Sequence, residues 1–197
     1  MADSPVSFGT DGWRASGDGF RTERVRAIGR AVATHLDERG PVGPVAVGYD
    51  ARERSRAAAT TLTDTLTAAT HDVTLADRDC PTPTLAWTVA TGSYAGGLVV
   101  TASHNPAGYN GVKILTAEGM PALPATTDEL EQLSATQAYD PPDPPAETTG
   151  QVEERNLREP YVEHLLDSVG VDLSGLTVAY DAMHGSGRAV TDTALER

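Results

Sequence analysis

Apolar residues along the chain follow two alternating patterns, short continuous runs and longer stretches with helical spacing. Between Thr22 and Gly40 the apolar side chains recur every three or four residues, which predicts a helix capped by Thr22 and ended by Gly40. Residues 45–50 (VAVGYD) then form a short apolar run ending in polar residues, as a buried strand would. By the same criteria, helices are predicted near 54–70, 84–91 and 127–137, and strands at 73–75, 97–101 and 112–115.

The order of these segments determines the predicted fold class. Strands that alternate with helices indicate a layered α/β domain built on a parallel or mixed sheet. No segment repeats at a fixed period, which argues against a solenoid or a propeller. We assign this first domain to residues 1–138.

A proline-rich stretch separates the first domain from a second, shorter unit. Residues 139–150 (YDPPDPPAETTG) contain four prolines within five positions, so few backbone donors remain and a linker is predicted. A helix at 156–169, a strand at 176–181 and the loop 184–187 (HGSG) then indicate the start of a second α/β domain in residues 151–197. Because this unit is shorter than a lone hydrophobic core usually requires, we expect it to be incomplete.

Composition and charge exclude several classes of protein. The 28 acidic residues outnumber the 15 basic ones, and the formal net charge is −13. Charge of this sign repels phosphate backbones and anionic lipids, so we expect no nucleic-acid and no membrane partner. The sequence shows neither an apolar run near the roughly 18 residues of a spanning helix nor an apolar leader, which predicts a cytoplasmic protein. One cysteine, Cys80, and five scattered histidines do not suggest a zinc site.

The basic residues are almost all arginine, and Lys113 is the only lysine. Acidic excess with scarce lysine resembles the composition of proteins from salt-loving archaea, which predicts a halophilic, haloarchaeal protein. A GC-rich genome that favours arginine codons is the alternative explanation. Under either explanation, one lysine has been kept at a position next to the candidate chemistry.

That chemistry lies in residues 101–106 (TASHNP), directly after a predicted buried strand. Ligands of open α/β sheets bind where loops leave the carboxyl ends of strands. Ser103 and His104 fit a hydrolase pair poorly, because adjacent residues project differently and no G-x-S-x-G elbow surrounds the serine. A loop serine that carries a phosphoryl group, beside an imidazole and a lysine, fits better. An ordinary turn held by Asn105 and Pro106 is the structural alternative.

Four segments in order, FGTDGWR (8–14), GYDAR (48–52), TASHNP (101–106) and YNGVKI (109–114), resemble the first domain of the α-D-phosphohexomutases. This family contains phosphoglucomutases, phosphomannomutases and phosphoglucosamine mutases, and FGTDGWR leans slightly toward the first two. A further segment, VAYDAMHGSGR (178–188), resembles the opening strand and loop of the family's second domain.

The resemblance implies a reaction. Ser103 would carry a phosphate, give it to a hexose phosphate, and take back the other phosphate of the resulting hexose 1,6-bisphosphate. Mg²⁺ would contact the phosphoserine at Ser103, while three aspartates of a DGDxDR-like loop in the second domain hold the ion. No such loop occurs in this sequence.

The resemblance also assigns roles to neighbouring residues. Arg14 would reach the active site, where a permanently charged fork suits phosphoryl oxygens. His104 would be a proton or charge partner, and Lys113 would be the active-site lysine. Asp50 and Arg52 would brace the loops. Each of the first three residues also has an alternative without a catalytic role. Arg14 would be an ordinary surface arginine, His104 an exposed loop histidine, and Lys113 a lysine kept by chance.

The chain corresponds to less than half of a typical family member, so we expect the isolated chain to be weak or inactive as a mutase. A truncated gene product, a partial sequence or a split enzyme whose missing domains come from a separate chain would each explain this length. The alternative from another functional class is a non-catalytic remnant or binding module that keeps the fold.

Overall fold

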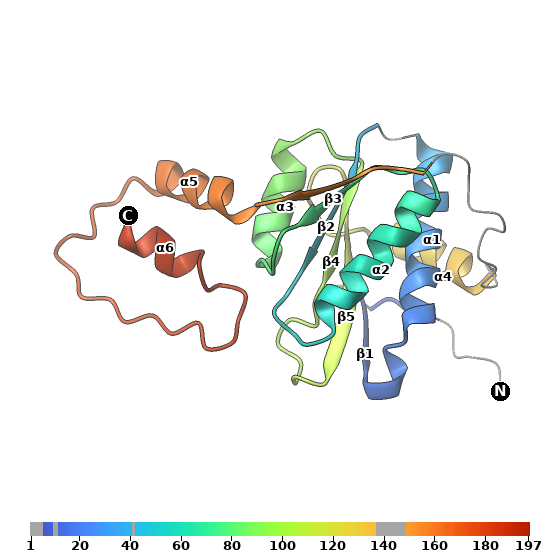
Figure 1. The fold of residues 1–197 in the computed structure, drawn as a ribbon, viewed down its shortest axis with the longest axis horizontal. Helices are drawn as coiled ribbons and strands as arrows, with labels where there is room; N and C mark the ends of the chain where they lie inside the picture. Colours follow the sequence, from blue (N-terminus) through green and yellow to red (C-terminus); the bar gives the residue numbers. More distant parts are fainter. Residues whose placement is uncertain (1–5, 10–11, 41, 137–148) are drawn as a thin grey trace.

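The computed structural model describes residues 6–9, 12–40, 42–136 and 149–197. At its centre lies a six-stranded mixed sheet in the order β1-β5-β4-β2-β3-β6 (Figure 1). The strands β4, β2, β3 and β6 run parallel, whereas β5 is antiparallel to both of its neighbours, β1 and β4. The strands are β1 (Trp13–Ser16), β2 (Val45–Tyr49), β3 (Val73–Ala76), β4 (Gly96–Val100), β5 (Tyr109–Leu115) and β6 (Val152–Arg155).

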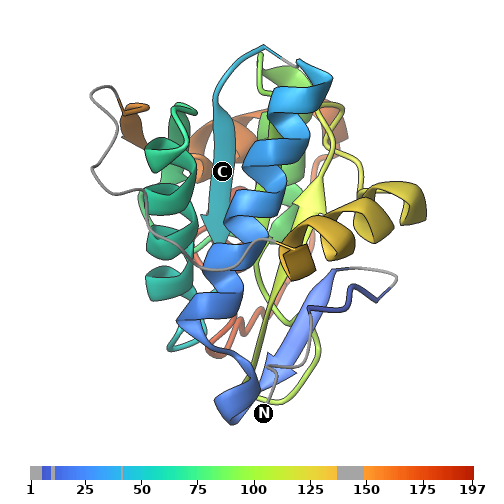
Figure 2. The same cartoon turned by 90° about the vertical axis from the view of Figure 1, so that its right-hand side faces the viewer.

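Helices cover both faces of this sheet, which confirms the predicted layered α/β architecture. One face carries α1 flanked by α2 and α4, and the opposite face carries α3 (Figures 1 and 2). In the described residues, no helix is both long and apolar enough to cross a membrane. The helices are α1 (Thr22–Arg39), α2 (Ser55–Ala68), α3 (Thr82–Thr91), α4 (Pro124–Thr136), α5 (Arg158–Val169) and α6 (Thr191–Glu196), with a short 3-10 turn η1 (Gly17–Gly19).

The hydrophobic core lies between the sheet and its helices. All five residues of β2 are buried, as expected for a strand covered on both faces. The apolar stripe of α1 includes Val25 and Ile28, which pack inward, and Gly40 ends the helix with a φ of +67° as predicted. The predicted cap was wrong, because Thr22 is already helical and Arg21 precedes the helix without a side-chain cap.

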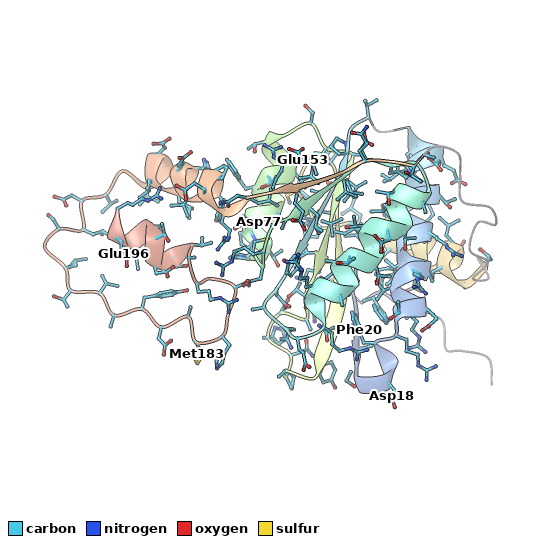
Figure 3. All side chains as sticks on the ribbon, in the orientation of Figure 1. Asp18, Phe20, Asp77, Glu153, Met183 and Glu196 are labelled. Carbon is cyan, nitrogen blue, oxygen red and sulfur yellow. The ribbon has the colours of Figure 1, made fainter. Side chains whose placement is uncertain are left out.

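The segment after α5 differs from the prediction. Residues 176–181 form no strand, and Leu176 and Val178 are 67% and 54% exposed. A strand is stabilised by pairing with a neighbour, and no strand in the described part of the chain pairs with this segment. In Figure 3 the side chain of Met183, on the same extended loop, projects from the molecule.

Two short strands, β1 and β6, were not expected from the sequence. β6 pairs in parallel with β3, with Val152 opposite Val73 and Arg155 opposite Ala76. Its four residues are all exposed, so it lacks the apolar pattern by which buried strands are recognised. β6 extends the sheet of the first unit, although the sequence-based division placed residues 151–197 in a second domain. Most of the predicted linker at 139–150 lies outside the described residues.

Candidate active site

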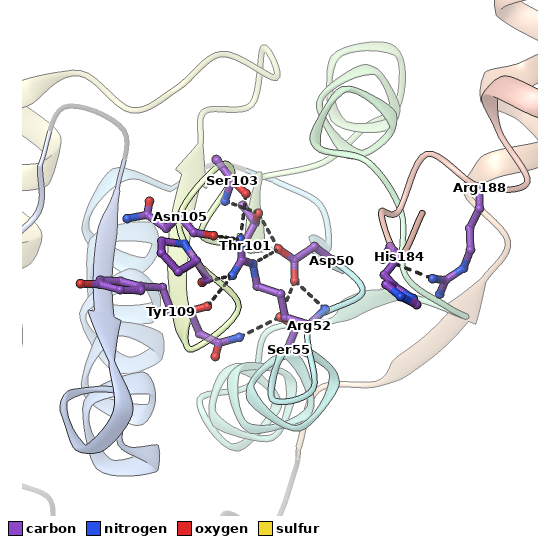
Figure 4. Close-up of polar contacts among 11 residues, drawn as sticks. Asp50, Arg52, Ser55, Thr101, Ser103, Asn105, Tyr109, His184 and Arg188 are labelled. Carbon is purple, nitrogen blue, oxygen red and sulfur yellow. Dashed lines mark hydrogen bonds and ion pairs between the residues drawn. The ribbon is translucent and has the colours of Figure 1, made fainter. Parts of the chain in front are cut away.

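Two chain segments leave the carboxyl ends of adjacent parallel strands and meet at one edge of the sheet (Figure 4). Asp50 follows β2, and its backbone N–H donates to the carbonyl of Val100 at the end of β4 over 2.9 Å. Thr101 then opens the loop 101–109, here called the Ser103 loop. This edge is where open α/β sheets bind ligands.

The Asp50 carboxylate connects these segments. Its Oδ1 accepts from the Ser55 hydroxyl at 2.6 Å and from the Arg52 backbone N–H at 3.2 Å. Its Oδ2 accepts from the Thr101 hydroxyl at 2.8 Å and from Arg52 Nε at 3.1 Å. The side chains of Asp50 and Arg52 are only 14% and 15% exposed, so this ion pair is shielded from water.

The Arg52 guanidinium holds the Ser103 loop by donating hydrogen bonds to the backbone carbonyls of that loop. Nη1 donates to the carbonyls of Pro106 at 2.6 Å and Tyr109 at 3.0 Å. Nη2 donates to the carbonyls of Ser103 at 2.8 Å and Asn105 at 2.6 Å. A planar fork with several donors suits this task, and these contacts agree with the bracing role that the family resemblance implied.

Ser103 lies at the exposed tip of this braced turn. Its φ is +54°, in the left-handed region that residues other than glycine rarely adopt. Its backbone N–H donates to the Thr101 hydroxyl over 3.0 Å. The neighbouring His104 is also exposed. The serine hydroxyl and the imidazole are therefore exposed to solvent on a backbone that Arg52 and Thr101 hold by hydrogen bonds.

Lys113 and Arg14 lie on the face of the sheet that carries α3. Lys113 is opposite Val99, Val99 is opposite Gly48, and a side chain at Gly48 would meet α3. Arg14 is opposite Gly111, two residues before Lys113, so the two cations share one face. At Gly111 an added Cβ would lie 2.3 Å from the Trp13 carbonyl oxygen, which explains why a glycine occupies this position opposite Arg14.

Two of the four predicted site residues, Ser103 and Lys113, line pockets at the start of α3, whereas Arg14 and His104 are not among the residues that line these two pockets. Lys113 lines a small pocket with Thr82, and Ser103 lines an adjoining cleft in which Thr82 also takes part. His184 and Ser186 line the same cleft, although HGSG was predicted only as a loop of the second domain. The sequence pattern Gly-Ser-Gly was the only signal that could have found this wall.

An ion pair fixes the HGSG loop against the sheet. Arg188 Nη2 contacts Asp79 Oδ1 at 2.9 Å, and Asp79 is buried just beyond β3. The same guanidinium donates to the carbonyl of His184 over 3.4 Å, as Figure 4 shows. The ion pair between Arg188 and Asp79 joins residues 109 positions apart in the sequence, so local patterns could not predict it.

Cys80, the only cysteine, lies close to this region but is chemically inert. It is 1% exposed, and burial raises the pKa of its thiol to about 12. A thiol with this pKa stays protonated near neutral pH and is a poor nucleophile. The observation supports a packing role for Cys80.

Metal binding requires different side chains from phosphate binding. In the described part of the chain, no three histidine, cysteine, aspartate or glutamate side chains come together as metal ligands do. The described residues therefore do not fit a complete Mg²⁺ site by themselves.

Comparison with known proteins gives consistent matches. The family described as phosphoglucomutase/phosphomannomutase, alpha/beta/alpha domain I, matches residues 5–140. A protein named as a probable phosphoglucosamine mutase from Methanopyrus kandleri is 36% identical over 190 residues, covering 95% of this chain and 40% of that protein. A phosphoglucosamine mutase from Nocardia farcinica is 33% identical over 201 residues, covering 93% of this chain and 43% of that protein.

Solved structures agree with the sequence matches. A Thermus thermophilus protein assigned as a phosphomannomutase superposes with a TM-score of 0.82 and is 33% identical, covering 98% of this chain and 43% of that one. A Burkholderia thailandensis protein of the phosphoglucomutase/phosphomannomutase family superposes with a TM-score of 0.67 at 25% identity, covering 81% of this chain and 35% of that one. The chain thus spans about two fifths of the length of these relatives.

Proposed function

The chain belongs to the phosphoglucomutase/phosphomannomutase family of α-D-phosphohexomutases, and from this premise we propose that it supplies the phosphoserine domain of a hexose phosphate mutase. The activity would interconvert sugar 1-phosphates and 6-phosphates through phosphorylated Ser103 and a hexose 1,6-bisphosphate. The relatives described above include phosphoglucosamine mutases and a phosphomannomutase, so we propose the hexose phosphates as the substrate class. The cytoplasmic location and the absence of nucleic-acid or membrane partners stay predictions.

One observation supports this proposal more than any other: an exposed Ser103 on a tightly braced loop beside a cleft. When Ser103 accepts a phosphoryl group from a bisphosphate, its Oγ forms a bond to phosphorus and the bond between phosphorus and the sugar oxygen breaks. The hydroxyl proton leaves Ser103 and a proton ends on the sugar oxygen, and we assign this transfer to His104. Lys113 and Arg14 would offset the negative charge of the phosphoryl oxygens.

Mg²⁺ is the cofactor that the family implies, and an oxygen of phosphorylated Ser103 is the ligand this chain would offer. Because the described residues bring no further ligand set together, we derive no step through the metal. A Mg²⁺ site that includes Ser103 would need ligands from additional polypeptide.

Additional polypeptide would also cover an exposed apolar surface. Leu176, Val178 and Tyr180 are 67%, 54% and 42% exposed, although their sequence is typical of a buried strand. We propose that the rest of a full-length mutase, in the same chain or in a separate one, packs here and completes the site. These 197 residues alone would then be weak as a mutase, since positioning supplies much of phosphoryl-transfer catalysis.

Phosphorylation of Ser103 can be tested without mutase activity. The protein is incubated with glucose 1,6-bisphosphate, and its intact mass is measured over time, with mannose and glucosamine 1,6-bisphosphates in parallel. We expect one added phosphoryl group on the wild type and on Ser93→Ala, a matched control at another exposed serine, and none on Ser103→Ala. No labelling of the wild type, or equal labelling of Ser103→Ala, would refute the proposal and favour a non-catalytic module.

A further inference from the structure

The proton positions around Asp50 follow from the acceptor that each donor faces. A carboxylate only accepts hydrogen bonds, so the Thr101 hydroxyl, 2.8 Å from Asp50 Oδ2, donates to it. The Thr101 oxygen keeps its lone pairs, and the backbone N–H of Ser103 donates to it over 3.0 Å. A directed relay therefore runs from the Ser103 amide through the Thr101 hydroxyl to the Asp50 carboxylate.

Both peptide groups that flank Ser103 are held by this network. The N–H on one side is bound by Thr101, and the carbonyl on the other side is bound by Arg52 Nη2 at 2.8 Å. The residue between them has the unfavourable φ of +54°. A non-glycine residue stays in this region only where its surroundings impose it. These two bonds do so together with the hydrogen bond that closes the turn, from the Asn105 N–H to the Ala102 carbonyl over 3.1 Å.

Threonine is well suited to position 101. The residue is 5% exposed, so water cannot readily replace its hydroxyl. Its branched Cβ restricts rotation about χ1, which keeps the hydroxyl between its two partners. Loss of the hydroxyl would leave the Ser103 N–H without this acceptor and Asp50 without one of its donors.

We propose that Thr101 is a positioning residue for phosphoryl transfer. Its hydroxyl helps to hold the left-handed backbone at Ser103, and this conformation sets the direction of Oγ on a residue that lines the cleft. This proposal rests on the proposed function for its kinetic consequence, whereas its structural part can be tested without any reaction. The relay occupies the Ser103 N–H, so that donor is not used to bind the phosphoryl group.

The test uses the intact 197-residue chain and two variants at one position. Thr101→Val keeps the shape but removes the hydroxyl, and Thr101→Ser keeps the hydroxyl. Amide hydrogen exchange at Ser103 is measured by NMR, and the rate of Ser103 phosphorylation by glucose 1,6-bisphosphate is measured by intact mass. We expect Thr101→Val to lose amide protection and to react about tenfold more slowly, the equivalent of about 1.4 kcal/mol. Thr101→Ser should keep protection and react within about threefold of the wild type.

Ser55→Ala provides the control for general destabilisation. Ser55 donates to the same carboxylate over 2.6 Å, but its oxygen accepts from Asn110 Nδ2 at 3.0 Å and does not contact Ser103. This variant removes a buried hydroxyl from the same network. It should lower the melting temperature while leaving the protection of the Ser103 amide in place.

Each outcome bears on one proposal. Unchanged Ser103 amide protection in Thr101→Val, or equal loss in Ser55→Ala, would overturn the relay. Lost protection with an unchanged phosphorylation rate would overturn the positioning role. A wild type that keeps a protected Ser103 amide but is never phosphorylated would refute the proposed function and leave the structural relay supported.

Discussion

Replacing Arg52 with lysine removes the planar group that holds the Ser103 loop. Arg52→Lys keeps the positive charge, but an ammonium on a flexible stem cannot reproduce one bond to Asp50 and four bonds to separate backbone carbonyls. Breaking one partner of a well-buried ion pair costs about 3 to 5 kcal/mol. Because the charge is retained and two of the carbonyl contacts are exposed, we expect a loss of about 2 to 3 kcal/mol in unfolding free energy.

The loss can be measured by thermal unfolding followed by circular dichroism, with urea titration as an independent measure. For a domain of this size, about 1 kcal/mol corresponds to roughly 2–4 °C, so the melting temperature should fall by about 4–12 °C. Amide exchange should rise throughout the Ser103 loop. It should change little in β2, which is buried on both faces.

Arg56→Lys is the matched control for this experiment. Arg56 lies in the first turn of α2 and is 60% exposed; it contacts Glu154 at 3.5 Å and donates to the Tyr49 hydroxyl at 3.0 Å and to one backbone carbonyl, that of Asp77, at 3.3 Å. Exposed pairs of this kind contribute at most about 1 kcal/mol. If Arg52→Lys destabilised the protein no more than Arg56→Lys does, the carbonyl contacts of Arg52 would not hold the loop and the account of the site would be wrong.

Three further predictions concern charge and burial. The melting temperature should rise with potassium chloride, because added salt screens the repulsion within a chain of net charge −13. The Debye length shrinks from about 10 Å at 0.1 M to about 3 Å at 1 M. A flat or falling melting temperature would favour codon bias over the halophile explanation. The hydrogen bond from His35 holds the pKa of the Glu129 carboxyl below its usual value, so this α1–α4 contact stabilises the fold above about pH 4.3 and is lost at lower pH. The stability difference between wild type and Glu129→Gln should therefore shrink in urea titrations as the pH falls below about 4, and a constant difference would contradict the assignment. Cys80 should resist thiol reagents at about pH 8 in the folded protein and react after denaturation in urea, whereas rapid labelling of the folded protein would show that it is not buried.

Several features of this protein follow from local sequence pattern. Helix α1 was predictable because its apolar residues repeat with the helical period and Gly40 can adopt a positive φ. Strands β2 and β4 were predictable because a strand buried on both faces is continuously apolar. The position of Ser103 at the end of β4 was predictable for the same reason, since the polar loop begins where the apolar run stops.

Other features depend on which segments meet in space. β6 carries no apolar pattern, and only its pairing with β3 makes it a strand, whereas residues 176–181 have a strand's composition but no partner in the described structure. Thr101 and Asp50 lie 51 residues apart, and their contact exists because β2 and β4 are neighbours in the sheet. Residue type and spacing therefore determined the elements and the candidate serine. The network that holds that serine was decided by tertiary structure, because hydrogen bonds between distant residues depend on strand order rather than on local sequence.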